Sequence, residues 1–282
     1  MIEALADTLA RDPRYAQTTN LVVLRDGELV LERHYGDDSA PSLADVYSVT
    51  KSVVSTLVGI ALGRGELASL DLPVHGGRTY RHLLTMSGGT RNDGPWEIDE
   101  VIALASGWRE HIEAAPRLEP PGTRFRYDNA AVHLLGCALT DVVGRSLADY
   151  ADEHLFAPLA IGPFEWPADH EGYSWGFGHL RLRPRDLARL GELWRRDGEG
   201  ILPSGYLVEA TRAQTPGGPP EGEGYGYLWW VGERSFFAAG YAGQALVVVP
   251  EERLVVAVTG IEERLQPTWR NPRHALAEVL SG

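Results

Sequence analysis

Cysteine and lysine are almost absent from this chain of 282 residues. The single cysteine, Cys137, rules out an internal disulfide, and its place in the apolar run from Val132 to Leu139 predicts a buried, inert thiol. The chain also has no apolar segment near the roughly 18 residues of a membrane span. Met1 to Arg14 lacks the basic stretch and apolar core of a secretion signal. We therefore expect no membrane partner and a cytoplasmic location.

Basic residues are outnumbered by acidic ones, 26 to 39, and the net charge is -13. With no basic run in the sequence, this balance excludes nucleic acid as a partner. The nine histidines form no H-E-x-x-H motif and no Cys/His cluster, and no phosphate-binding glycine loop is present. We therefore expect no metal and no cofactor. A hydrophobic content of 44% is typical of a globular protein with a substantial core.

The most apolar helix is predicted from Ser52 to Leu62, where hydrophobic residues occupy nearly every face. Gly63 and Gly65 provide its end. If Ser48 lies at the N-terminus of this helix, Lys51 lies one turn further along the same face. The spacing therefore predicts a nucleophile beside a base.

Lys51 is the only lysine, since the other 25 basic residues are arginine. An arginine keeps its proton in a protein, whereas a desolvated lysine near a positive helix end loses it and acts as a base. The alternative is that Ser48 caps the helix and Lys51 extends along the surface from its first turn. The placement of the only side-chain amine three residues after Ser48 favours the chemical interpretation.

Strand patterns occur at both ends of the chain. A hairpin is predicted from Thr19 to Arg33 around Asp26-Gly27, and a short helix with Leu5 and Leu9 on one face precedes it. Four strands and a closing helix are predicted late in the chain, at Tyr225 to Val231, Arg234 to Ala238, Ala245 to Val249, Leu254 to Val258 and Arg273 to Leu280.

Helical patterns dominate the middle of the chain, at Leu83-Leu84, Glu100 to Ala105, Ala130 to Val143, Leu147 to Phe156 and Pro184 to Arg196. We therefore expect an α+β fold in which both chain ends form one antiparallel sheet, flanked by helices and carrying an inserted helical domain. Residues 1–70 and 212–282 would form the sheet domain and residues 71–211 the helical domain.

Three motifs in order carry a resemblance to a known family: Ser48-x-x-Lys51, Tyr127-x-Asn129 and Gly240-Tyr241-Ala242-Gly243. Together they resemble the serine β-lactamase and penicillin-binding-protein superfamily, nearest its class C-like branch with esterases and 6-aminohexanoate-dimer hydrolases. The agreement spans almost the whole chain and extends to Tyr47 to Gly65, His82 to Gly88, Phe125 to Gly136, Arg185 to Arg189 and Gly243-Gln244.

This resemblance implies an acyl-enzyme mechanism on a small-molecule ester or amide. Ser48 would attack the carbonyl, with Lys51 and Tyr127 sharing the work of base and proton shuttle. Asn129 would orient Lys51 and an acyl amide oxygen, and the backbone N–H groups of Ser48 and Tyr241 would form the oxyanion hole. The sequence does not predict an oligomeric state.

Each of these residues also has a purely structural interpretation. Tyr127 can be a core tyrosine and Asn129 the N-cap of a helix that starts at Ala130. Gly240 and Gly243 can simply be turn residues.

The third motif departs from the family. Where the family usually has lysine or histidine before the motif glycine, this chain has Ala238-Ala239-Gly240. That cation normally meets a substrate carboxylate, so its absence favours nonpolar esters or amides over β-lactams and D-alanyl peptides. Arg126 is the residue that would supply the charge from elsewhere.

Other functions stay open: an acyltransferase on the same acyl-enzyme, a β-lactamase or D-alanyl peptidase, or a noncatalytic binding module. Ser174 in Gly172-Tyr173-Ser174-Trp175-Gly176, together with His75-Gly76-Gly77, resembles an α/β-hydrolase signature. That fold requires a buried strand before the serine and a helix after it. Glu165 to His170 is polar, and Gly176-Phe177-Gly178 is no helix start, so we favour Ser48. Trp96, Tyr173 and Trp175 can wall a pocket or fill space between two lobes.

Overall fold

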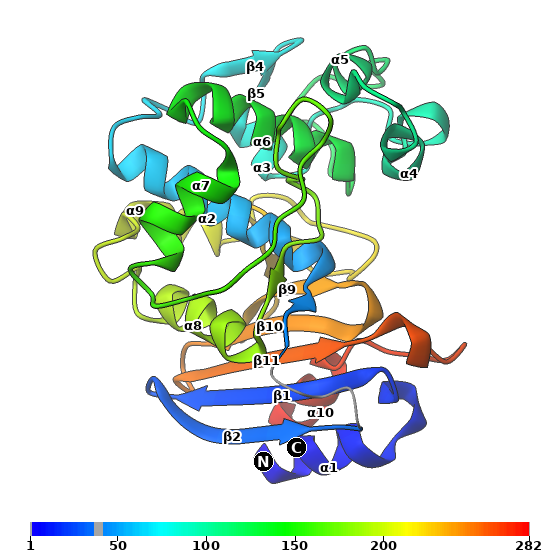
Figure 1. The fold of residues 1–282 in the computed structure, drawn as a ribbon, viewed down its shortest axis with the longest axis vertical. Helices are drawn as coiled ribbons and strands as arrows, with labels where there is room; N and C mark the ends of the chain where they lie inside the picture. The colour runs from blue at the N-terminus through cyan, green and yellow to red at the C-terminus, as the bar shows by residue number, and fades with distance from the viewer. Residues whose placement is uncertain (1, 37–41, 282) are drawn as a thin grey trace.

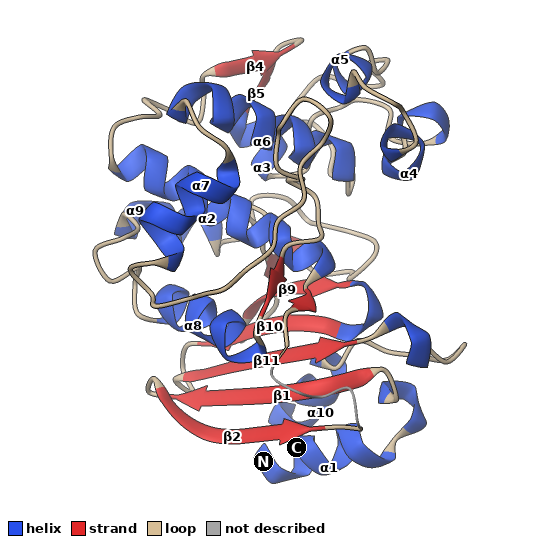
Figure 2. Ribbon diagram, in the orientation of Figure 1, coloured by secondary structure: helices blue, strands red, loops and turns tan. Residues whose placement is uncertain are grey.

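A seven-stranded antiparallel sheet forms the base of the molecule (Figures 1 and 2). The structure, a computed structural model, describes residues 2–36 and 42–281. The strand order is β2-β1-β11-β10-β9-β8-β7, so the first strands of the chain lie beside the last. Their bounds are β1 (Thr18–Arg25), β2 (Glu28–His34), β7 (Gly224–Tyr225), β8 (Trp230–Val231), β9 (Phe236–Gly240), β10 (Gln244–Val249) and β11 (Leu254–Gly260). The predicted sheet formed by both chain ends is confirmed.

The hairpin of β1 and β2 turns at Asp26-Gly27, as predicted. Both residues have left-handed φ values, 52° and 81°, which is the geometry of a tight hairpin turn. On its other side β1 pairs antiparallel with β11, from Arg25 opposite Leu254 to Thr18 opposite Gly260.

The prediction of one strand from Tyr225 to Val231 is wrong. The segment forms the two short strands β7 and β8, separated by a turn in which Leu228 has a φ of 58°. Leu228 N–H donates to the Leu84 carbonyl at 2.9 Å, and its carbonyl accepts from Ser52 Oγ at 2.7 Å. These bonds to distant parts of the chain hold the turn, so the aromatic composition of the segment does not reveal it. β9 also begins two residues later than predicted.

Helices cover both faces of the sheet (Figure 1). α1 (Ile2–Arg11) and α10 (Arg273–Ser281) lie on one side, and α8 (Pro184–Arg195) lies on the other. α8 packs closely because it carries Gly191, where a Cβ would stand 2.5 Å from Val255 Cγ1. This helix falls inside the range 71–211 predicted as the helical domain, yet it packs on β1, β10 and β11. The division into two domains stays a prediction.

α2 (Thr50–Gly63) passes between the sheet and the remaining helices (Figure 1). Every residue from Thr50 to Ala61 is buried, in line with its apolar sequence. The other helices are α3 (Tyr80–Leu84), α4 (Ile98–Ile102), α5 (Trp108–Glu113), α6 (Asn129–Val143), α7 (Leu147–Ala151), which continues as a π-helical segment (Asp152–Phe156), and α9 (Ser204–Ala210). Two small ribbons pair β3 (Ala44–Asp45) with β6 (Arg181–Leu182) and β4 (Pro73–His75) with β5 (Arg78–Thr79). The sequence did not predict α5 and α9.

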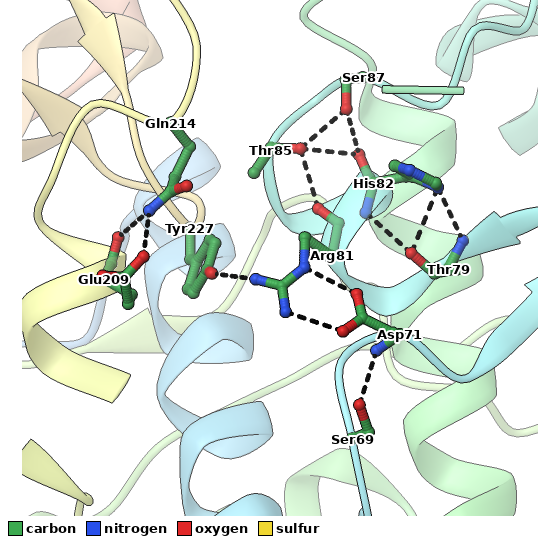
Figure 3. Close-up of polar contacts among 10 residues, drawn as sticks. All are labelled: Ser69, Asp71, Thr79, Arg81, His82, Thr85, Ser87, Glu209, Gln214 and Tyr227. Carbon is green, nitrogen blue, oxygen red and sulfur yellow. Dashed lines mark hydrogen bonds and ion pairs between the residues drawn. The ribbon is translucent and has the colours of Figure 1, made fainter. Parts of the chain in front are cut away.

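A polar network ties α3 to the turn between β7 and β8 (Figure 3). Arg81 donates to Asp71 at 2.8 and 3.1 Å and to the Tyr227 hydroxyl at 2.6 Å. Thr79 caps α3 by accepting from His82 N–H at 3.4 Å. The network therefore holds the turn that also bonds to α2 through Ser52.

Within residues 2–36 and 42–281, no single helix has both the length and the hydrophobicity needed to cross a membrane. Asn129–Val143 and Leu147–Phe156 meet that criterion only when joined, and they are bent by 70° at the break between them.

Candidate active site

Ser48 lies in a 3₁₀ turn (Tyr47–Val49) that leads directly into α2. Tyr47 has a φ of 45°, a left-handed conformation that is uncommon for a residue with a side chain. Its N–H donates to Asp45 Oδ1 at 2.7 Å, and its carbonyl accepts from Thr50 Oγ1 at 2.6 Å. These two bonds hold the strained backbone and thereby fix the position of Ser48.

Lys51 lies beneath Ser48 and is only 1% exposed. Its Nζ donates to Ser48 Oγ at 2.7 Å and to the Phe177 carbonyl at 2.6 Å. Burial lowers the pKa of Lys51 from 10.5 to about 7, and the carboxylate of Asp128 acts in the opposite direction. A substantial fraction of this amine is therefore neutral near pH 7 and able to accept a proton.

Tyr127 lies on the segment that enters α6, on the other side of the same amine. Lys51 Nζ is 5.1 Å from the centre of the Tyr127 ring, which stacks on Trp230 at 5.8 Å. Asn92 Nδ2 donates to the Tyr127 carbonyl at 2.7 Å and holds the backbone. Burial raises the pKa of Tyr127 well above its usual value, and a hydrogen bond with Ser48 acts in the opposite direction. The phenol therefore keeps its proton at neutral pH.

Asn129 lines the same cleft, but it is not the N-cap that its structural interpretation predicts. The N-cap of α6 is Asp128, whose Oδ1 accepts from Ala131 N–H at 2.9 Å, and Asn129 is the first helical residue. Across the described residues, no hydrogen bond joins Asn129 to Lys51. The Phe177 carbonyl orients the amine instead.

Two residues that line the cleft, Ser48 and Tyr241, have backbone N–H groups without acceptors among the described residues. Tyr241 is the first residue of a 3₁₀ turn (Tyr241–Gly243), and Ser48 is the second residue of its own turn. The first N–H groups of a helical turn have no acceptor inside it, and neither group has another acceptor in residues 2–36 and 42–281. Both residues line the cleft, as the predicted oxyanion hole requires.

Gly240 allows the end of β9 to approach the segment before Ser48. A Cβ at Gly240 would stand 2.7 Å from the Val46 carbonyl oxygen and 2.9 Å from Gln244 Cβ. Because its φ is -133°, the requirement for glycine here comes from close packing and not from the backbone conformation.

Gly240→Ala is therefore expected to lower kcat for ester hydrolysis by about 10–100-fold, because a shift of β9 moves the Tyr241 N–H away from Ser48. The matched control is Gly178→Ala, on another wall of the cleft, where the new Cβ would meet the Tyr47 carbonyl oxygen at an ordinary 3.6 Å. Steady-state kinetics on folded variants make the comparison. Equal activity of the two variants would contradict the assignment.

The cleft around Ser48 has a volume of about 530 Å³. Its lining comes from several separate segments: Tyr47, Ser48, Glu97, Ile98, Asp99, Asn129, Phe177, Gly178, His179, Tyr241 and Glu262. Most of these residues were not predicted, because they come from loops and helix ends that carry no motif. His179 illustrates this, since its Nδ1 is 2.7 Å from Asp45 Oδ2 across 134 residues of sequence.

Arg126 does not supply the missing cation of the third motif. Its guanidinium pairs with Glu119 at 2.9 Å, and it is not among the residues that line the cleft. Ala238 is buried within β9. Ser174 is also buried and accepts from Ala148 N–H at 3.3 Å, and the described residues after it begin no helix there, so the α/β-hydrolase geometry is absent at this serine.

One buried cluster was not predicted from the sequence. His133, Cys137 and Asp169 offer donor atoms within 4.8 Å of one another. Asp169 accepts from His133 Nε2 at 3.0 Å and from the N–H groups of Glu171 and Tyr173 at 2.9 Å. The carboxylate therefore organises its own loop. Burial raises the pKa of the Cys137 thiol, in keeping with the predicted inert state.

This chain belongs to the beta-lactamase family, since the sequence model of that family matches residues 7–261. A search of curated proteins finds no match to the chain.

Solved structures agree with this assignment at the level of the fold. A protein from Bacillus anthracis assigned as a 6-aminohexanoate-dimer hydrolase is 20% identical, with a TM-score of 0.77 over 100% of this chain and 80% of that one. The octameric penicillin-binding protein homologue from Pyrococcus abyssi is 22% identical, with a TM-score of 0.76 over 99% and 76%. EstCE1, a hydrolase with promiscuous acyltransferase activity, is 16% identical, with a TM-score of 0.77 over 99% of both chains. The fold is beta-lactamase-like, and the family supports a hydrolase.

Proposed function

We propose that the protein is a serine hydrolase that cleaves small esters or amides through an acyl-enzyme on Ser48. The observation that carries this proposal is the 2.7 Å contact between Lys51 Nζ and Ser48 Oγ at a cleft. A buried amine with a pKa of about 7 is matched to general-base work near neutral pH.

In acylation, the neutral Lys51 amine takes the Ser48 hydroxyl proton while Oγ bonds to the substrate carbonyl carbon. The carbonyl electrons move to oxygen, where the N–H groups of Ser48 and Tyr241 stabilise the charge. The tetrahedral intermediate then collapses and expels the leaving group, which takes a proton from the Tyr127 hydroxyl. The Lys51 ammonium then gives its extra proton to the Tyr127 phenolate, so the site ends neutral.

In deacylation, water attacks the acyl carbon and the same groups run in reverse. The neutral Lys51 amine accepts the water proton and then gives a proton to Ser48 Oγ as the bond between Oγ and the acyl carbon breaks. An alcohol in place of water would give acyl transfer, the promiscuous activity for which EstCE1 is named. Product analysis with a competing alcohol separates the two outcomes.

The missing cation before Gly240 supports substrates without a carboxylate at that position. We therefore expect measurable hydrolysis of p-nitrophenyl esters and slow or absent turnover of penicillin. Efficient penicillinase kinetics would contradict this substrate assignment.

The test of the proposal is covalent labelling by a fluorophosphonate probe, followed by peptide mass spectrometry. We expect one adduct on the peptide that contains Ser48, and its loss in Ser48→Ala. Ser174→Ala is the matched control, because it removes the hydroxyl of the competing serine motif and should keep the adduct. Labelling that persists in Ser48→Ala, or its absence from the unmodified protein, would overturn the proposal.

A further inference from the structure

We propose that the Ser48 cleft selects esters and amides that carry a positively charged ammonium group away from the scissile carbonyl. This inference rests on the proposed acyl-enzyme function and names its substrate class. Three features of the cleft support it. Its carboxylates have no cationic partners among the described residues, no arginine or lysine is among the described residues that line it, and aromatic side chains lie beside the carboxylates.

Three carboxylates line the cleft from two parts of the fold. Glu97 and Asp99 lie at the N-terminal end of α4, among the helices far from the sheet. Glu262 lies just after β11, at the end of a strand of the seven-stranded sheet (Figure 1). A ligand in the cleft therefore lies between negative charges on different walls. Acidic residues from one exposed stretch of sequence would place their charge on one side only.

None of the three forms an ion pair with another described residue, although many other carboxylates of the chain pair with arginine. Among the described residues, the Glu97 carboxylate accepts only from Asp99 N–H, at 3.2 Å, and the Glu262 carboxylate accepts from the Tyr47 hydroxyl, at 3.3 Å. Asp99 is exposed to solvent. Their negative charge is thus available to a ligand.

Among the residues that the structure describes, no arginine and no lysine lines the cleft. His179 lines it, with its Nδ1 2.7 Å from Asp45 Oδ2, and Lys51 lies buried beneath Ser48 with a lowered pKa. Arg126 is neutralised by Glu119. A substrate carboxylate would meet repulsion here, whereas a substrate cation would be attracted.

Aromatic rings beside the carboxylates provide the second element of ammonium recognition. The Tyr47 and Tyr241 rings meet edge to face at 5.6 Å, and Trp269 lies against Tyr241 at 6.0 Å. Tyr241 is 47% exposed, so its ring is open to a ligand. The hydrogen bond from the Tyr47 hydroxyl to Glu262 places a ring and a carboxylate side by side at the entrance to Ser48.

The experiment compares p-nitrophenyl esters of equal acyl length whose far ends are trimethylammonium, tert-butyl or carboxylate. The first two ends have nearly the same shape, so their ratio of kcat/KM reports charge alone. We expect the cationic ester to exceed the neutral one by about tenfold, and the neutral ester to exceed the anionic one. The preference should shrink as salt is added, since the carboxylates at the entrance are screened.

Substitutions locate the effect. Glu262→Gln keeps an acceptor for the Tyr47 hydroxyl while removing the charge, and it should lower the ratio of cationic to neutral kcat/KM by about threefold or more. Glu97→Gln combined with Asp99→Asn should do the same from the other wall. The matched control is Glu263→Gln, which removes the same charge from the next residue, outside the cleft lining, and should leave the ratio unchanged.

Equal kcat/KM for the cationic and neutral esters, or a preference for the anionic one, overturns the inference while leaving the proposed function in place. An equal change of the ratio in Glu262→Gln and Glu263→Gln also overturns it, because net charge would then explain the preference. Failure to hydrolyse all three esters, with no fluorophosphonate adduct on Ser48, removes the proposed function and this inference with it.

Discussion

Lys51→Met is expected to lower kcat for p-nitrophenyl ester hydrolysis by about 10²–10⁴-fold, the usual contribution of a positioned general base. Methionine fills the same buried space but cannot accept the Ser48 proton. The free energy of unfolding should not fall, since removing a buried amine removes a desolvation cost. Steady-state kinetics and thermal unfolding of the same preparation check both statements.

The matched variant is Lys51→Arg, which keeps a positive charge but cannot act as a base. If the role of Lys51 were to supply charge, the arginine variant would retain activity, and the proposed mechanism would be wrong. If its role is to accept a proton, both variants lose activity to a similar extent.

The pH profile of the unmodified protein gives an independent measurement of the same group. Because the neutral amine is the active form and burial lowers its pKa to about 7, kcat/KM should rise about tenfold per pH unit below pH 7 and level off above it. Tyr127 must stay protonated, and its raised pKa places any decline above pH 10. A profile that is flat from pH 5 to 9 would contradict the assignment.

The parts of the site that lie on continuous motifs could be predicted from the sequence. Ser48 and Lys51 are three residues apart at the start of a helix, so local geometry alone brings them together. The hairpin turn at Asp26-Gly27 and the apolar helix α2 were predictable for the same reason, because each is determined by residues that are neighbours in the sequence.

The parts that depend on contacts between distant segments could not be predicted. The turn at Leu228 exists because of hydrogen bonds to Leu84 and Ser52, and its sequence alone favours a strand. The Phe177 carbonyl holds Lys51 across 126 residues, and a backbone carbonyl leaves no signal in the sequence. Glu97 and Glu262 line the same cleft only because the folded chain packs α4 and the end of β11 around it.

The position of Tyr127 leads to the second large expected effect, which is a change in how strongly kcat/KM depends on the leaving group. A phenol that keeps its proton and lies against the Lys51 amine that bonds to Ser48 is placed to protonate the departing alcohol. Tyr127→Phe should therefore lower kcat/KM by about 10²–10⁴-fold for an alkyl ester, whose alkoxide is a poor leaving group. The loss should be much smaller for a p-nitrophenyl ester, because p-nitrophenolate departs without a proton.

A series of esters with one acyl group and leaving groups of different basicity measures this difference directly. The slope of log kcat/KM against leaving-group pKa should become steeper in Tyr127→Phe than in the unmodified protein. Tyr35→Phe is the control, because it removes another partly buried hydroxyl, one that donates to the Ala6 carbonyl at 3.2 Å beside the sheet. An unchanged slope with a uniform loss across the series would show that Tyr127 acts on Ser48 before bond formation, as a base or an orienting group, and not on the leaving group.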